Sequence, residues 1–141
     1  MIMRRILFAL LIILTLAFTG CGGDYSTVYT DVNTVEGVTL ALKEDTLKPS
    51  RATFVLTNDS DADVVYDPVE FHLEEKKKDI WQENIGTRQS AWKRDTTETL
   101  AAGASKELEV NWKGLCGGIN SGEHRIILIV NEQPVACEFT K

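Results

Sequence analysis

The side chains with the most versatile chemistry in this chain are its three cysteines, Cys21, Cys116 and Cys137. A thiolate can act as a nucleophile, pair in a disulfide, bind a metal or carry a covalent group. Cys21 follows two small residues and an apolar run over residues 6–18, and Arg4 and Arg5 precede that run. A positive start, an apolar middle and a small-residue cleavage site are typical of a secretory signal peptide. Residues 1–20 are therefore predicted to be such a peptide.

Residues 18–21, Phe-Thr-Gly-Cys, resemble the lipobox of bacterial lipoprotein signal peptides. The resemblance implies attachment of diacylglycerol to Cys21, cleavage before it, and a lipid anchor that includes acyl chains such as palmitate. An uncleaved membrane span fits less well, because the apolar run of 13 residues is shorter than the roughly 20 needed to cross a bilayer. An ordinary secretory signal would leave an unpaired thiol at the new N-terminus. Two acyl chains give stable attachment, so the expected location is the extracytoplasmic face of a cell membrane.

Removal of the signal would leave Cys116 and Cys137 as an even pair in an exported protein, where disulfides are permitted. Their bridge would close a loop of 22 residues, which chain-entropy estimates value at roughly 3 kcal/mol. Two buried free thiols are the alternative, since cysteine packs well as a small apolar side chain. We expect the disulfide.

The two histidines, His72 and His124, are far apart in the sequence and from the cysteines. They offer too few ligands in a suitable pattern for zinc, so no metal and no cofactor is expected. His72 lies between Glu70 and Glu74 on the side of a predicted strand that should face water. A histidine that acts as a general base needs a nucleophile and an orienting group within reach, and the sequence suggests neither. Both histidines are predicted to be solvated, and no catalytic residue is assigned.

Three aspartates, Asp59, Asp61 and Asp63, occupy positions 1, 3 and 5 of a sequence that resembles a calcium-binding EF-hand loop, with Glu70 at position 12. That loop requires glycine at position 6, where this chain has Val64. A hairpin turn with solvated carboxylates is the favoured interpretation, and weak calcium binding at the aspartates stays open.

Three tryptophans, Trp81, Trp92 and Trp112, could be recognition aromatics or packing residues. Trp112 ends the clearest alternating segment and is predicted to face the core. Trp92 lies in the least regular segment and is the candidate recognition residue.

The whole chain has 141 residues and a net charge of −6, and loss of Arg4 and Arg5 with the signal would bring the charge to −8. The mature length suits one domain. Binding to nucleic acid requires a positively charged surface. Because the domain has an excess of acidic residues, no nucleic acid partner is expected.

Alternation of apolar and polar residues begins at Gly37 and continues nearly to the C-terminus. This period predicts strands over residues 38–43, 52–57, 64–66, 69–74, 80–82, 107–112, 125–130 and 135–140, with residues 96–100 as a further short candidate. The segment 69–74 should direct Val69, Phe71 and Leu73 inward. Asp67-Pro68 should end the short strand 64–66 before this segment, and the lysine-rich residues 75–79 should form the end of a hairpin. The nearly continuous apolar segment 125–130 is typical of a central strand.

Short strands with turn signals between them predict an all-β protein, an antiparallel immunoglobulin-like β-sandwich of about seven to eight strands. A small closed barrel is the alternative. The expected organisation is a signal peptide over 1–20, a flexible tether over 21–35 and the sandwich domain over 36–141.

Several strand-and-turn segments resemble a family of bacterial immunoglobulin-like domains found in exported lipoproteins and other envelope proteins. These segments are residues 42–49, 52–58, 73–76 with Trp81, 103–108 with Trp112, 121–126 and 138–139. The chain departs from the family at Ala102, where proline is usual, and at His124, where tyrosine is usual. The resemblance implies a non-enzymatic module without an agreed ligand.

The leading functional hypothesis is a membrane-anchored, non-catalytic immunoglobulin-like module that binds an envelope protein or glycan, or gives structural support, at the cell envelope. The alternative is an envelope protease inhibitor, in which a loop such as residues 86–95 would enter the cleft of the protease.

Overall fold

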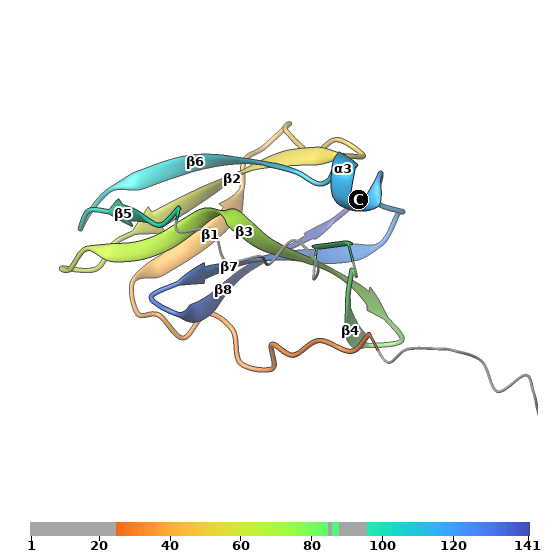
Figure 1. Cartoon of the computed structure of the whole chain (residues 1–141), viewed down its shortest axis with the longest axis horizontal. Helices are drawn as coiled ribbons and strands as arrows, with labels where there is room; N and C mark the ends of the chain where they lie inside the picture. The colour runs from red at the N-terminus through yellow and green to blue at the C-terminus, as the bar shows by residue number, and fades with distance from the viewer. Residues whose placement is uncertain (1–24, 85, 88–95) are drawn as a thin grey trace, which may run out of the picture.

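The computed structural model describes residues 25–84, 86–87 and 96–141. In these residues, eight strands form two antiparallel sheets that pack face to face (Figure 1), so the predicted β-sandwich is confirmed. The strands are β1 (Val38–Leu42), β2 (Arg51–Asn58), β3 (Val64–Lys77), β4 (Ile80–Glu83), β5 (Glu98–Leu100), β6 (Ser105–Asn111), β7 (Glu123–Val130) and β8 (Gln133–Thr140). A short helix, α3 (Lys113–Cys116), follows β6 in a segment that the sequence predicts as loop.

The smaller sheet has the strand order β1-β2-β6, and the larger sheet has the order β4-β3-β7-β8. β5 also belongs to the larger sheet, where it pairs with the first residues of β3. β7 therefore lies between two neighbours, as its nearly continuous apolar sequence predicts.

The core lies between the two sheets and is built from alternate residues of the facing strands. Phe54 and Leu56 of β2 are fully buried, as are Val130 of β7 and Val135 of β8. Trp112, just after β6, is also fully buried, which confirms its predicted core position.

β3 is one continuous strand, so the predicted break at Asp67-Pro68 is wrong. The pairing of β3 with β7 shifts its register between Tyr66 and Phe71, which is a β-bulge. A bulge accommodates a proline that has no N–H for the ladder. Val69 lies in this bulge and is exposed rather than inward-facing.

Two tight hairpins connect strands of the larger sheet. Lys78 and Asp79 join β3 to β4 with φ angles of 51° and 64°, and Asn131 and Glu132 join β7 to β8 with φ angles of 48° and 63°. Positive φ at both central residues is the geometry of a two-residue type I′ turn, whose twist matches that of the flanking strands. The lysine-rich hairpin end is thus present, with the strand extending further than predicted, to Lys77.

The pairing of β3 with β5 also places Tyr66 opposite Glu98. Burial, together with a carboxylate of Glu98 that accepts the hydroxyl hydrogen at 2.8 Å, raises the pKa of Tyr66 to about 12. Since the folded pKa lies above the ordinary value of 10.0, the neutral phenol contributes stability below pH 10. That contribution is lost as the pH rises through 12.

We expect a spectrophotometric titration of the native protein to show one tyrosine that ionises near pH 12. Tyr66→Phe should remove this step, Tyr25→Phe should leave it, and Glu98→Gln should move it to lower pH. A step that survives in Tyr66→Phe would contradict the assignment.

Candidate functional site

The segment of residues 25–35, called the strap here, crosses the face of the larger sheet that points away from the core. Figure 1 shows it in orange, on the opposite side of the larger sheet from β2 and β6. Its first residues pair with the free edge of β4: Glu83 N–H donates to the Tyr25 carbonyl at 2.8 Å, and Thr27 N–H donates to the Trp81 carbonyl at 3.0 Å. The start of the strap is therefore an added antiparallel strand.

The far end of the strap is hydrogen-bonded to β8. Asn33 N–H donates to the Pro134 carbonyl at 2.9 Å, and the Asn33 side-chain oxygen accepts from Ala136 N–H at 2.7 Å. The sequence predicts a flexible tether over residues 21–35. Its described part, residues 25–35, is held at both edges of the sheet.

A buried ion pair lies beneath the strap. Arg125 of β7 donates its Nε hydrogen to Glu74 of β3 at 2.5 Å, and both side chains are almost completely buried. Thr27 donates its hydroxyl to the other carboxylate oxygen of Glu74. The Arg125 guanidinium also donates to the Tyr29 carbonyl at 3.0 Å and lies over the Trp81 ring at 4.6 Å from its centroid. The pair thus joins two strands to the strap.

A second buried group centres on His72. Its Nδ1 lies 2.9 Å from a carboxylate oxygen of Glu83, and its Nε2 lies 2.9 Å from the hydroxyl of Tyr29. An ionised carboxylate only accepts hydrogen bonds, so Nδ1 carries the hydrogen, and in the neutral imidazole Nε2 accepts from the Tyr29 hydroxyl. The prediction of a solvated His72 is wrong, because the strap covers the face of β3 that the sequence assigns to water.

The order hydroxyl, imidazole and carboxylate is also that of groups that activate a nucleophile. Here the hydroxyl belongs to a phenol of the strap, and the Tyr29 and His72 rings pack against each other with centroids 5.0 Å apart. Each imidazole nitrogen already has a protein partner. The arrangement therefore fits attachment of the strap better than catalysis.

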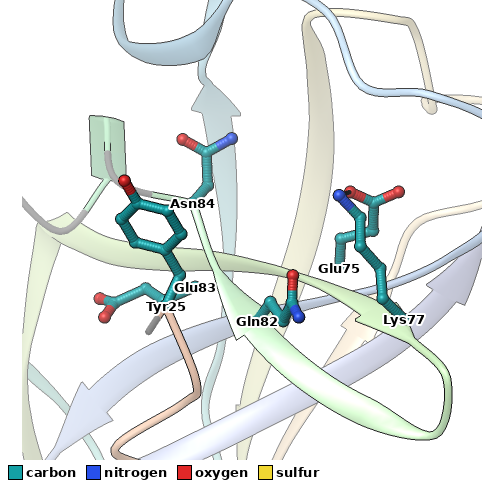
Figure 2. A pocket seen from close by; sticks show the side chains of 6 residues that line it. All are labelled: Tyr25, Glu75, Lys77, Gln82, Glu83 and Asn84. Carbon is teal, nitrogen blue, oxygen red and sulfur yellow. Dashed lines mark ion pairs between the residues drawn. The ribbon is translucent and has the colours of Figure 1, made fainter. Parts of the chain in front are cut away.

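A hollow of about 250 Å³ opens beside the strap, on the other face of the β3–β4 hairpin (Figure 2). The lining is polar apart from one aromatic ring, and consists of Tyr25, Glu75, Lys77, Gln82, Glu83 and Asn84. Lys77 and Glu75 form an ion pair at 3.1 Å within it. Two of its lining residues also border a smaller hollow of about 60 Å³ next to His124.

His124 is buried, so its predicted solvation is wrong as well. Its Nε2 donates to the Asn120 carbonyl at 2.8 Å, and its ring stacks on Phe139 with an interplanar angle of 25°. Nδ1 has no hydrogen-bond partner. The residue lies at the end of the core between the sheets and packs as an aromatic.

The predicted disulfide is absent: Cys116 and Cys137 are both free thiols. Cys116 ends α3 and its thiol donates to the Trp112 carbonyl at 3.6 Å, whereas Cys137 is buried in β8 and its thiol donates to the Glu138 carbonyl at 3.7 Å. Burial raises the pKa of both thiols, which disfavours the reactive thiolate. Both thiols are free, as the alternative predicts, but only Cys137 is buried, whereas Cys116 is half-buried.

Cys21 and the candidate recognition residue Trp92 lie outside the described residues, and so do residues 88–95 of the loop in the protease-inhibitor alternative. The three aspartates of the proposed calcium loop lie in the turn before β3, where Asp63 accepts the Ala102 N–H at 3.0 Å. Within residues 25–84, 86–87 and 96–141, no group of three or more histidine, cysteine, aspartate or glutamate side chains is placed to hold a metal.

Alternation alone assigns Glu74 and His72 to the side of β3 that faces water, so it does not predict the buried network. One signal was available: Arg125 opens the most apolar strand of the chain. An arginine in a strand buried on both faces requires a carboxylate partner.

The model of the bacterial Ig-like domain family matches residues 34–140. No curated protein matches the chain. No helix in the described part of the chain has the length and apolar character needed to cross a membrane. The matched range covers both sheets and the last residues of the strap.

Proposed function

Since this chain belongs to the bacterial Ig-like domain family, we propose that it is a bacterial lipoprotein, anchored by lipid on Cys21, whose domain is a non-catalytic binding or structural module at the cell envelope. The observation that carries the proposal is the lipobox-like sequence of residues 18–21, which ends only three residues before the strap. The strap in turn is bonded to the larger sheet.

The mechanism follows from this connection. A diacylglyceryl group holds the protein at the membrane without a spanning helix. The sandwich then acts as a rigid body that presents its loops to envelope partners, and confinement to the membrane surface raises their effective concentration. The partner would be an envelope protein or a glycan.

Cys21→Ser should move nearly all of the protein from the membrane fraction to the soluble extracytoplasmic fraction of the native host, because the proposed lipid attachment site is lost. Intact mass should show a diacylglyceryl group and acyl chains on the wild-type N-terminus. Cys116→Ser is the matched control and should remain in the membrane fraction with the lipid attached. An unmodified wild-type N-terminus, or a Cys21→Ser protein that still sediments with membranes, would contradict the proposal.

The protease-inhibitor alternative depends on residues 86–95, of which only Gly86 and Thr87 are described, and it stays a prediction. Thr87 is fully buried and bonded to the backbone of Leu73, so it belongs to the scaffold of that loop. Incubation of the purified protein with a panel of envelope and secreted proteases tests the alternative, which requires inhibition of at least one of them.

A further inference from the structure

We propose that one end of the sandwich lies against an anionic lipid bilayer and so fixes the orientation of the domain on the membrane. This end, called the hairpin end here, consists of the β3–β4 hairpin and the first residues of the strap. Its exposed residues are Tyr25, Ser26, Val28, Lys77, Lys78, Asp79 and Ile80. The inference rests on the proposed lipidation of Cys21.

The first argument is the length of chain between the lipid and the structure. Four Cα steps separate Cys21 from Tyr25, and even a fully extended chain covers only about 14 Å in four steps. Tyr25 cannot move away from the sandwich, because its carbonyl accepts the Glu83 N–H of β4. The hairpin end is therefore the part of the domain that a lipid on Cys21 would hold closest to the membrane. In Figure 1 the strap begins beside β4, whereas β5 lies at the opposite end of the molecule.

The second argument is the apolar surface at this end. Ser26 of the strap bridges Gln82 in an isolated antiparallel pair, and Val28 and Ile80 each lie two residues from that bridge. Val28 is 62% exposed and Ile80 is 53% exposed. Isolated apolar residues on a surface need no explanation, but these two flank the same bridge, at the end of the domain where the strap begins. Side chains of this kind enter the interfacial region of a bilayer readily.

The third argument is the distribution of charge along β3. Three consecutive lysines, residues 76–78, lie at its C-terminal end. Asp59, Asp61 and Asp63 lie in the turn at its N-terminal end, which is about 40 Å away at the rise of an extended strand. Lys77 pairs with Glu75 at 3.1 Å and Lys76 pairs with Glu123 at 3.6 Å, whereas Lys78 forms no ion pair with any of the described residues. The exposed Asp79 follows Lys78, so this end is mixed in charge, whereas the charged residues of the turn at the other end are all acidic. An anionic surface attracts the lysine end and repels the aspartate end, so both charges favour the same orientation.

The experiment uses the full-length protein from its host, with lipid on Cys21 verified by intact mass, in vesicles of phosphatidylcholine and phosphatidylglycerol. A fluorescent non-natural amino acid replaces either Ile80 or Val65, which is 46% exposed at the opposite end of β3. The vesicles carry a nitroxide quencher on the lipid headgroup. Position 80 should be quenched several-fold more strongly than position 65. Equal quenching of the two, in protein whose lipid is confirmed, would overturn the orientation while leaving the lipoprotein proposal intact.

Two further variants test the surface itself, both carrying the probe at position 80. Val28→Asp should reduce quenching, whereas Val69→Asp, a change at an equally apolar exposed residue in the β3 bulge, should not. Reversal of residues 76–78 to glutamate should reduce quenching in vesicles that contain phosphatidylglycerol. Unchanged quenching in both the Val28 and the lysine variants would show that the surface makes no contact with lipid and would overturn the proposal. Failure of the lipoprotein proposal can be distinguished from this result, because the intact-mass measurement before the vesicle experiment would then show an N-terminus without lipid.

Discussion

Arg125→Met is expected to lower the free energy of unfolding by about 3–5 kcal/mol, because it would leave the Glu74 carboxylate buried without its cation. Glu74 is fully buried and its strongest partner is the Arg125 guanidinium at 2.5 Å. The strap would also lose the hydrogen bond from Arg125 to the Tyr29 carbonyl. We therefore expect the amides of the strap to exchange hydrogen faster than those of the core strands.

Urea-induced unfolding of the purified domain measures the effect. Lys43→Met is the matched control, since it removes the cation of an exposed ion pair with Glu107, and such pairs contribute only about 0–1 kcal/mol. The double variant Glu74→Met with Arg125→Met should recover most of the loss, because it leaves no unpaired charge. An Arg125→Met protein as stable as the Lys43 control would show that the buried pair does not hold the strap.

Trp112→Ala is expected to lower the free energy of unfolding by about 3–5 kcal/mol, the usual range for removal of a buried aromatic side chain. Trp112 is fully buried between the sheets, and its indole N–H donates to the Pro49 carbonyl at 2.9 Å. Its backbone carbonyl accepts from the N–H groups of Leu115 and Cys116 in α3. The change would thus leave a cavity and release the connection between β6 and the β1–β2 loop.

Urea-induced unfolding again measures the free energy of unfolding. Val65→Ala is the control at an exposed apolar position, where a change of this free energy within about 0.5 kcal/mol is expected. Trp112→Phe should fall between the two, because it keeps most of the apolar volume but loses the hydrogen bond to Pro49. A Trp112→Ala protein that unfolds with the control would contradict the central position of this residue in the core.

The strands that pack one face on the core were predictable from the sequence. In β2 the alternate residues Ala52, Phe54 and Leu56 are apolar and buried, and in β6 Leu108 and Val110 are, so alternation alone identifies both the strand and its inward face. The turn between the predicted strands 125–130 and 135–140 is also present, but it is shorter than predicted, because β8 begins at Gln133.

The outer face of the larger sheet was not predictable by the same rule. Alternation shows which side of a strand is polar, and polar side chains normally face water. Here the strap covers that side and its own polar groups pair with those of His72 and Glu74. Only the first residues of the strap pair with β4, and the rest crosses the sheet to β8. The strap therefore has no sustained period, so nothing in its sequence showed where it would lie.

The predicted disulfide between Cys116 and Cys137 is wrong for a related reason. An even number of cysteines in an exported chain favours a bridge, but a disulfide also needs Cα atoms within about 7 Å and side chains that point toward each other. The sequence did not predict α3, which sets the direction of the Cys116 side chain. The even number of cysteines therefore favours a bridge without showing whether the two side chains can reach each other.

The attachment of the strap to β4 and β8 covers backbone groups that could otherwise pair with a neighbouring copy of the protein. Unpaired backbone groups at the side of a sheet readily join a strand from another molecule, and this leads to aggregation. Part of each side of the larger sheet is occupied, by Tyr25 and Thr27 along β4 and by Asn33 along β8. Proteins concentrated in the plane of a membrane meet one another far more often than they do in free solution. The strap would then keep crowded neighbours from polymerising through this sheet.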